Sequence, residues 1–442
     1  MVSRVGDQGG AEPADGSGSC LPNLDLIIRG LLYVYIFSLP FKQLLFIERN
    51  GFIILIVLVV LWCAINRRHF FTRTPIDLPL LCFVAWVGLT VPFATFPEYS
   101  AKEFAKLVQQ GLIFYLVAYF FKDVHDRVRV SMVLMIALFV VSASTYPQFF
   151  SMLGREPSIE GNIVVDAFLP GEVWLTTYLI MLIPLSLSLA LYTGERSSRI
   201  FYACIAAMAI VSLVFTFSRA GYLALIVELW VVAWLLRRKV FWRIAAFASL
   251  IILGGMTVIV VYDATYKGNI RVLPGTSIPL KFTASAVKHR MEIWQFAAES
   301  VREHPLVGIG FGKDNFRLVH AGSAKSLQDK HVLEAGTHNT FLDIALGTGI
   351  PGLVFFLWLM LRIGSRALRL FRRHEEGFCK AISMGAGVCV LGLSVRVFFD
   401  HMFIGTLAIM FWVLVSLALA AKSPNVSSVR ASSVFARQGE LS

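Results

Sequence analysis

The chain contains 442 residues, of which 57% are hydrophobic and only 15% are charged, and its formal net charge is +12. Soluble domains are about half apolar and about a quarter charged, so this chain lacks the polar residues that soluble domains of its size need at their surfaces. The composition excludes a soluble enzyme, a secreted disulfide-rich scaffold and a disordered chain.

The chain begins with residues 1–23, which are rich in Gly, Asp and Ser and which we expect to form a disordered cytoplasmic segment. This segment has no apolar core, so we do not expect a cleaved signal peptide. None of the six cysteines has Cys-x-x-Cys spacing, which gives no sign of a zinc site or a redox pair. We expect them to be small apolar residues in helices.

Apolar runs of about 20 residues follow, the length that an α-helix needs to cross the hydrocarbon core of a bilayer. They predict an all-α, polytopic membrane protein with about twelve transmembrane helices. The runs lie at 24–46, 51–65, 77–95, 104–121, 130–150, 172–192, 200–217, 221–236, 244–262, 339–361, 381–398 and 402–420. Transmembrane helices 1–9 therefore fall within residues 24–262, and helices 10–12 fall within 338–421.

Lys and Arg residues are distributed unevenly over the connections, and such residues favour cytoplasmic loops. If the N-terminus is cytoplasmic, the inside connections carry most of the basic residues, at 67–73, 122–129, 196–199, 237–243 and 362–380, and in the tail 422–442. The short outside connections carry few. We therefore expect both termini to be cytoplasmic, and no nucleic-acid partner is needed to explain the positive charge.

One outside connection, residues 263–337, is much longer than the others. Within it, the apolar residues of 284–302 recur at helical spacing and predict an amphipathic helix. His304-Pro305 ends this helix, and three glycines between 308 and 312 predict a flexible turn that could act as a hinge. A short second helix is expected at 313–320.

Two arginines stand on the outer side, against the general distribution of charge. Arg219 occupies a short turn between two spans, and Arg290 lies on the amphipathic helix. A guanidinium group can bind phosphate through two hydrogen bonds, and an arginine at a membrane boundary is costly without an anionic partner. Each arginine also has an alternative without a phosphate ligand. The side chain of Arg219 could extend to the membrane–water interface, and Arg290 could lie on a solvated helix face.

His338 lies at the predicted start of a span, where the positive end of the helix dipole disfavours an imidazolium ion. A neutral imidazole can accept a proton from a hydroxyl group, which is the role of a general base. The alternative is a polar residue of the capping region with no chemical role. Together, Arg219, Arg290 and His338 would suit an anionic head group.

Other charged residues give less information about chemistry. No Asp-x-Asp pair is present and the remaining outer histidines lack ligand spacing, so we expect no metal site. Glu228, Arg396 and Asp400 lie in or beside predicted spans, where charged groups are costly and could line a cavity.

The residues around His338 carry a family resemblance. His338-Asn339-Thr340-Phe341-Leu342, then six residues, Gly349, two residues and Gly352 match the signature of bacterial O-antigen ligases. The segment from Arg290 through Trp294 and His304-Pro305 to Gly312 resembles the part of the family that precedes this signature, and Ser218-Arg219-Ala220-Gly221-Tyr222 resembles its arginine-bearing turn. The likeness covers about residues 200–360.

The resemblance implies a GT-C-like glycosyltransferase of the bacterial inner membrane, with its active site and the loop 263–337 in the periplasm. Such enzymes need no cofactor or metal and transfer a glycan from undecaprenyl diphosphate to lipid A–core oligosaccharide in lipopolysaccharide biosynthesis. On this resemblance, Arg219 and Arg290 bind the donor diphosphate and His338 activates the acceptor hydroxyl. Asn339, Arg396 and Asp400 are further candidates for the site.

Three alternatives stay open. An O-antigen polymerase joins carrier-linked repeats to each other, and a protein O-oligosaccharyltransferase uses a Ser or Thr hydroxyl as the acceptor. A transporter of lipid-linked sugars belongs to a different class and predicts polar groups and broken helices near the bilayer midplane. The concentration of polar clusters on one face favours catalysis at that face. A direct displacement there would invert the anomeric configuration.

Overall fold

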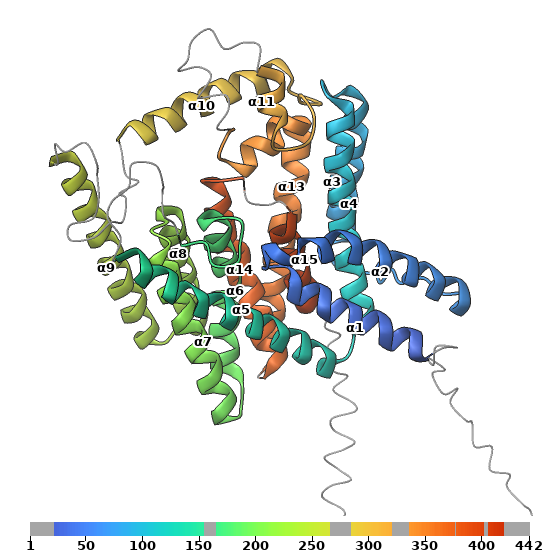
Figure 1. Ribbon diagram of the computed structural model, residues 1–442, viewed down its shortest axis with the longest axis horizontal. Coiled ribbons are helices and arrows are strands. Elements are labelled where there is room, and N and C mark those ends of the chain that lie inside the picture. Colours follow the sequence, from blue (N-terminus) through green and yellow to red (C-terminus); the bar gives the residue numbers. More distant parts are fainter. Residues whose placement is uncertain are drawn as a thin grey trace, which may run out of the picture.

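The computed structural model describes residues 22–153, 165–265, 284–320, 336–375, 377–401 and 405–419, and within them every regular element is a helix (Figure 1). The first half contains α1 (Pro22–Ser38), η1 (Lys42–Leu44), α2 (Leu45–Asn66), α3 (Asp77–Thr90), η2 (Val91–Phe93), α4 (Pro97–Phe120), α5 (Val124–Leu153), α6 (Glu172–Tyr192) and α7 (Arg196–Phe215). The second half contains α8 (Arg219–Leu236), α9 (Lys239–Thr265), α10 (Ala284–Glu303), α11 (Asn315–His320), α13 (Thr340–Arg373), α14 (Phe378–Phe398) and α15 (Gly405–Leu419).

Each predicted apolar run coincides with a helix of this fold. Among the described residues, eight helices are long and apolar enough to cross a membrane, and Asp77–Phe93 and Gly405–Leu419 are shorter apolar helices. The chain is therefore a polytopic helical membrane protein, whereas the number twelve stays a prediction. The terminal segments 1–21 and 420–442 lie outside the described residues, so the expected disorder of residues 1–23 and the expected cytoplasmic location of both termini stay predictions.

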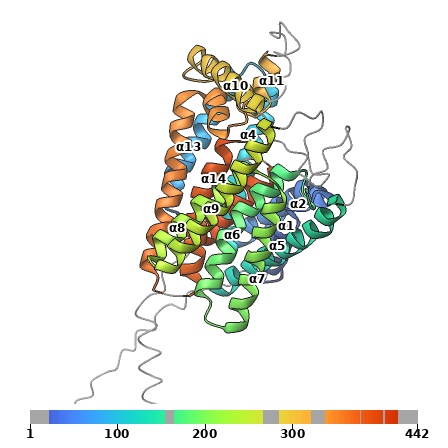
Figure 2. The same cartoon turned by 90° about the vertical axis from the view of Figure 1, so that its left-hand side faces the viewer.

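The amphipathic helix expected in the long outer connection is confirmed as α10, and the short helix after it is α11. In both views, α10 lies across one end of the bundle instead of running along it (Figures 1 and 2). Residues 266–283 and 321–335 of the same connection lie outside the described residues. That this connection faces the periplasm stays a prediction.

Helix α14 lies at the centre of the bundle and packs against α6, α8, α13 and α15. Small residues permit these close contacts. A Cβ atom added to Gly385 would lie 2.8 Å from the Cα of Leu185 in α6, and one added to Gly387 would lie 2.8 Å from a methyl carbon of Leu368 in α13. Membrane helices approach one another closely where glycine replaces a larger side chain.

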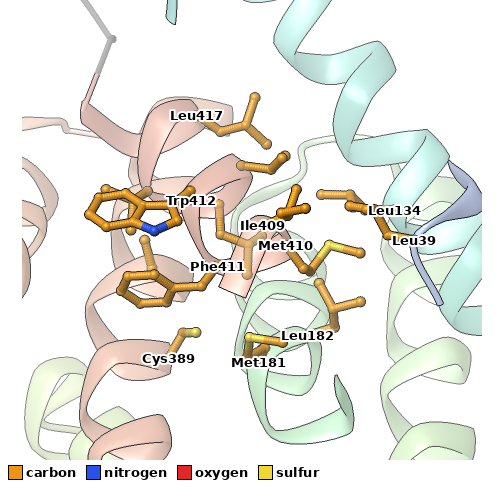
Figure 3. Close-up of a cluster of buried hydrophobic side chains, with 14 of the residues drawn as sticks. Leu39, Leu134, Met181, Leu182, Cys389, Ile409, Met410, Phe411, Trp412 and Leu417 are labelled. Carbon is orange, nitrogen blue, oxygen red and sulfur yellow. The ribbon is translucent and has the colours of Figure 1, made fainter. Parts of the chain in front are cut away.

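Helix α15 is buried on all sides despite its short length, because every residue from Thr406 to Leu419 is buried. The rings of Phe411 and Trp412 lie edge to face with centroids 5.6 Å apart, beside Cys389 of α14 and Met181 of α6 (Figure 3). The ring of Trp412 also lies 5.7 Å from that of Phe114 in α4. This core joins the two halves of the chain, because α15 packs against α4 as well as α14.

Helix α13 is broken at Gly349, whose backbone angles are φ 74° and ψ −179°. Only glycine adopts this conformation readily, and a Cβ atom there would lie 2.0 Å from the carbonyl oxygen of Leu306. Residues 340–348 therefore form a short separate helix, and the rings of Phe341 and Phe356 lie only 6.0 Å apart across the break. The long apolar part of α13 thus begins after Gly349, ten residues later than the start of the predicted run at 339.

The turn with three glycines packs firmly against this short helix. The backbone N–H groups of Ile309 and Gly310 donate hydrogen bonds to the carbonyl groups of Leu346 and Gly347, at 2.8 and 3.1 Å. These are carbonyl groups of the last helical turn, which need partners outside the helix. Since a Cβ atom on Gly308 would lie 2.3 Å from the Leu346 oxygen, the glycines serve close packing, and the structure does not support the predicted hinge.

Basic residues gather at the opposite end of the bundle. The guanidinium of Arg372, in the last turn of α13, lies 5.5 Å from the ring centroid of Trp234 near the end of α8. The ammonium of Lys380, at the start of α14, lies 5.4 Å from the ring of Tyr192. The connections that were predicted to be cytoplasmic therefore meet at one end, and the candidate site lies at the other.

Candidate active site

His338 is held in an unusual backbone conformation directly before the short helix. Its φ of +50° lies in the left-handed region, which residues other than glycine rarely occupy. The next residue, Asn339, caps the helix, because its Oδ1 accepts a hydrogen bond of 3.1 Å from the N–H of Leu342. Such local strain is typical of functional sites. The strained turn and the cap together fix where the imidazole ring points.

The imidazole ring of His338 pairs with the carboxylate of Asp400. His338 Nδ1 lies 3.1 Å from Asp400 Oδ1, and the Thr340 hydroxyl donates a hydrogen bond of 2.9 Å to the Asp400 carbonyl. Burial favours a higher pKa for the Asp400 carboxyl, but the hydrogen bond from His338 and the charge of Arg396 hold this pKa below its usual value. Asp400 Oδ1 can accept a proton from Nδ1, and in a neutral imidazole this arrangement leaves the lone pair at Nε2.

Arg396 supports Asp400 from the core. Its guanidinium is 1% exposed, donates from Nη1 to Asp400 Oδ2 at 3.1 Å, and donates from Nη2 to the carbonyl of Val173 at 3.3 Å. The two oxygens of Asp400 are thus divided between His338 and Arg396. A buried guanidinium needs such partners because an unpaired buried charge is strongly destabilising.

The structure brings Arg219 and Arg290 together. Arg219 is the first residue of α8, after Ser218, whose hydroxyl caps the helix by accepting from the N–H of Gly221 at 3.3 Å. The charges of Arg219 and Arg290 repel each other, and the charge of Arg290 also acts on Arg396. Three arginines thus form one positive cluster, hereafter the arginine cluster: Arg219, Arg290 and Arg396.

Helix α10 places Arg290 beside the histidine segment. One helical turn after Arg290, the indole N–H of Trp294 donates a hydrogen bond of 2.9 Å to the carbonyl of Thr337, the residue before His338. The Trp294 ring also lies edge to face with Phe398, with centroids 5.5 Å apart. The side chains of Lys288 and His289, the two residues before Arg290, lie outside the described residues.

His401 is the residue of the site that sequence reasoning missed. Its ring stacks on that of His338, with centroids 5.5 Å and planes 25° apart. Burial lowers the pKa of His401 to about 4, so the ring is neutral near pH 7. Its position directly after Asp400 at the end of an outward-running span was the available signal.

His338, Asp400 and His401 could together hold a metal ion, since their ligand atoms lie within 4.8 Å of one another. This cluster was not expected from the sequence, which shows no ligand spacing. Two features argue against a cation there: Asp400 Oδ2 already accepts from a guanidinium, and the arginine cluster adds positive charge nearby. The residues fit a hydrogen-bonded relay better than a metal centre.

Two other residues that the sequence singled out are not part of the site. His304 is exposed at the end of α10. Glu228 is fully buried in α8, where its carboxylate packs against Gly392 of α14, and both its oxygens lack hydrogen-bond partners within the described part of the chain. Glu228 therefore belongs to the helix packing of the bundle.

The site combines a base with a place for negative charge. A hydroxyl group near His338 Nε2 could lose its proton to that nitrogen while Asp400 stabilises the imidazolium ion that forms. The arginine cluster could stabilise a diphosphate that leaves with its electron pair. This combination is suited to transferring a group from a diphosphate to a hydroxyl.

Residues 203–357 match the family model described as O-antigen ligase. This part of the chain is thus similar to the O-antigen ligase family. A protein of Rickettsia conorii named "Putative polysaccharide ligase" is 31% identical over 105 residues, which cover 23% of this chain and 24% of that protein. A protein of Rickettsia felis with the same description is 32% identical over 82 residues, 18% of this chain and 20% of the relative. The chain thus matches about a quarter or less of the length of these relatives.

The matched segment 203–357 contains Arg219, Arg290 and His338, but it ends before Arg396, Asp400 and His401. The fold adds these last three residues to the site through the end of α14 and the connection to α15. The capping role of Asn339 and the backbone break at Gly349 also give physical reasons for two positions of the signature around His338.

Proposed function

We propose that this protein is a membrane glycosyltransferase, an O-antigen ligase that transfers a glycan from undecaprenyl diphosphate to a hydroxyl of lipid A–core oligosaccharide at the periplasmic face of the inner membrane. The observation that carries the proposal is the chain of contacts from His338 through Asp400 to Arg396, beside Arg219 and Arg290. The match of residues 203–357 to the O-antigen ligase family supports it.

The reaction needs a single displacement. His338 Nε2 takes the proton of the acceptor hydroxyl, and the oxygen attacks the anomeric carbon of the donor sugar as the bond to the diphosphate breaks. Arg219 and Arg290 stabilise the charge of the departing undecaprenyl diphosphate. Because one bond forms on the face opposite to the one that breaks, the product has inverted anomeric configuration. Retention in the product would rule out this mechanism.

Deletion of the gene followed by gel electrophoresis of the lipopolysaccharide tests the function. An O-antigen ligase predicts loss of the whole ladder, with polymer still attached to its lipid carrier. A core that bears a single repeat would instead identify a polymerase. Normal lipopolysaccharide together with an unglycosylated pilin would identify a transferase with a protein acceptor.

Complementation with variants tests the site within the same strain. His338→Ala should fail to restore the ladder although the protein reaches the membrane. The matched control is His304→Ala, because His304 is exposed at the same end of the bundle and has no place in the site. Normal transfer by His338→Ala would contradict the role of a general base.

Treatment with a chelator tests metal independence. We expect purified protein to retain transfer after incubation with EDTA, because the arginine cluster supplies the positive charge that a metal ion supplies in other transferases. Loss of activity that Mg²⁺, Mn²⁺ or Zn²⁺ restores would favour a metal at His338, Asp400 and His401.

A further inference from the structure

A pocket adjoins His401 but is not lined by any member of the arginine cluster. The empty space within it amounts to about 680 Å³, which includes space open to solvent. Its walls come from α3, α4, both parts of α13, the turn at 311–313 and the connection that precedes α15. The polar members include Lys106, Gln110, Lys313, Thr340, Asp343 and His401.

The pocket lies next to the proposed base, with His401 between them. This residue lines the pocket, and its ring stacks on the ring of His338. Thr340 also lines the pocket and donates a hydrogen bond to the backbone carbonyl of Asp400. His338 therefore has the arginine cluster on its Asp400 side and this pocket on its His401 side.

The lining of the pocket combines apolar faces with hydrogen-bonding groups. Phe311 supplies partly exposed aromatic surface, Phe83 and Phe356 line the pocket although they are nearly fully buried, and Lys106 forms an ion pair of 2.6 Å with Glu103 at the edge. This mixture suits a sugar ring, which presents apolar C–H faces and hydroxyl groups at once. This balance of basic and acidic side chains differs from the arginine cluster, whose three guanidinium groups suit a diphosphate.

Asp343 provides a specific requirement for a hydrogen-bond donor. One oxygen of its carboxylate accepts from the Thr337 hydroxyl, and the other is buried without a hydrogen-bond partner among the described residues. A buried unsatisfied carboxylate oxygen is costly, and a sugar hydroxyl can donate to it. Gln110, which is 6% exposed, contributes an amide to the same pocket.

We propose that this pocket binds the sugar of the acceptor glycan whose hydroxyl group is deprotonated by His338. The inference rests on the proposed function and adds to it a separate site for the acceptor. Donor and acceptor would then approach His338 from two sides, so that the hydroxyl reaches the anomeric carbon without crossing the arginine cluster. A glycan acceptor fits this pocket better than the Ser or Thr side chain of a protein, because a sugar ring can use the aromatic surface as well.

Steady-state kinetics of the full-length protein in detergent can test the acceptor site. The donor is an undecaprenyl-diphosphate-linked glycan, and the acceptor is lipid A–core oligosaccharide purified from a strain without O antigen. Lys106→Ala and Asp343→Asn should each raise the KM for the acceptor about five- to tenfold, the effect of losing one or two hydrogen bonds, and leave the Kd for the donor unchanged. The amide of Asp343→Asn retains one oxygen, which can still accept the hydrogen bond from the Thr337 hydroxyl.

Lys102→Ala is the matched control for Lys106→Ala. Lys102 lies one helical turn earlier in α4, is exposed and does not line the pocket, so its removal should leave the KM for the acceptor unchanged. Because the side chain of Lys106 is 56% exposed, its replacement should not disturb folding. The Lys106→Ala variant therefore keeps the test valid if Asp343→Asn is unstable.

Two outcomes separate the failure of this inference from the failure of the proposed function. If the wild-type protein transfers glycan but both pocket variants keep the KM for the acceptor, the acceptor site is wrong and the function stands. The same conclusion follows if the variants weaken donor binding instead. If the wild-type protein transfers no glycan to this acceptor, the proposed function itself is wrong.

Discussion

The Nδ1 atom of His338 lies 3.1 Å from the Oδ1 atom of Asp400, although 62 residues separate them in the chain. The contact joins the strained turn before the broken helix α13 to the end of α14. It gives His338 a partner that fixes its orientation and tautomer, which a helix terminus alone would not. Asn339, not His338, caps the helix, and the predicted effect of the helix dipole on His338 stays a prediction.

Asp400→Asn should lower kcat for glycan transfer by about 100-fold or more, with little change in donor binding, since the amide neither fixes the tautomer nor stabilises the imidazolium. Initial rates at saturating donor and acceptor measure this. The control is Asp166→Asn, which removes a carboxylate from an exposed ion pair with Lys42. Gel filtration must show that the Asp400→Asn variant is folded, because Arg396 loses its buried partner. A folded variant with unchanged kcat would contradict the relay.

Arg219→Lys and Arg290→Lys should each weaken donor binding about tenfold or more. Lysine keeps the charge but loses the planar group that binds two phosphate oxygens at once. Binding of undecaprenyl diphosphate itself, measured by titration, checks this without any acceptor. Arg243→Lys serves as the control, because Arg243 is exposed in the first turns of α9, at the basic end of the bundle. Equal affinities of all three variants for undecaprenyl diphosphate would show that Arg219 and Arg290 do not bind the donor.

His401 should make the folded protein less stable in mild acid. Its pKa is about 4 when folded and about 6.5 when unfolded, so between these values the unfolded chain binds a proton that the folded chain does not. The contribution of neutral His401 is complete above about pH 6.5 and is lost as the pH falls toward 4, by no more than about 3 kcal/mol. Thermal unfolding midpoints at pH 7.5 and 5 should differ less for His401→Gln than for the wild type. Equal differences would contradict the burial of a neutral ring.

Gly349→Ala should destabilise the protein by at least about 2 kcal/mol, because the backbone conformation is restricted to glycine and a Cβ atom meets the Leu306 carbonyl. Gly364→Ala in the same helix is the control, since its nearest neighbour is a Val390 methyl at 3.4 Å. Thermal unfolding in detergent compares the two. Similar midpoints for both variants would show that the break is not required.

The helices of the bundle could be predicted from the sequence, because a span of apolar residues is a local signal. Arg219, Arg290 and His338 could also be found, since they are polar residues in outer segments. The contacts that these residues make in the fold could not be predicted. The partner of His338 depends on how α14 packs beside α13, and no local pattern encodes that distance.

Three features escaped prediction for a related reason. The break at Gly349 lies inside an apolar run, where glycine alone does not distinguish a bend from close packing. The glycines at 308–312 indicated flexibility by composition, whereas they serve contacts with a helix that lies nearby only in the fold. His401 was overlooked although it follows Asp400, because its stacking on His338 depends on how distant parts of the chain pack.

The short helix between His338 and Gly349 has a consequence for how chains of this kind can vary. Its first turn is capped by Asn339, and the carbonyl groups of its last turn bind the backbone at 309–310, so both ends are anchored. One inserted or deleted residue would rotate His338 by about 100° about the helix axis and carry its ring away from Asp400. Length changes in this stretch should therefore be far less tolerated than substitutions on its surface.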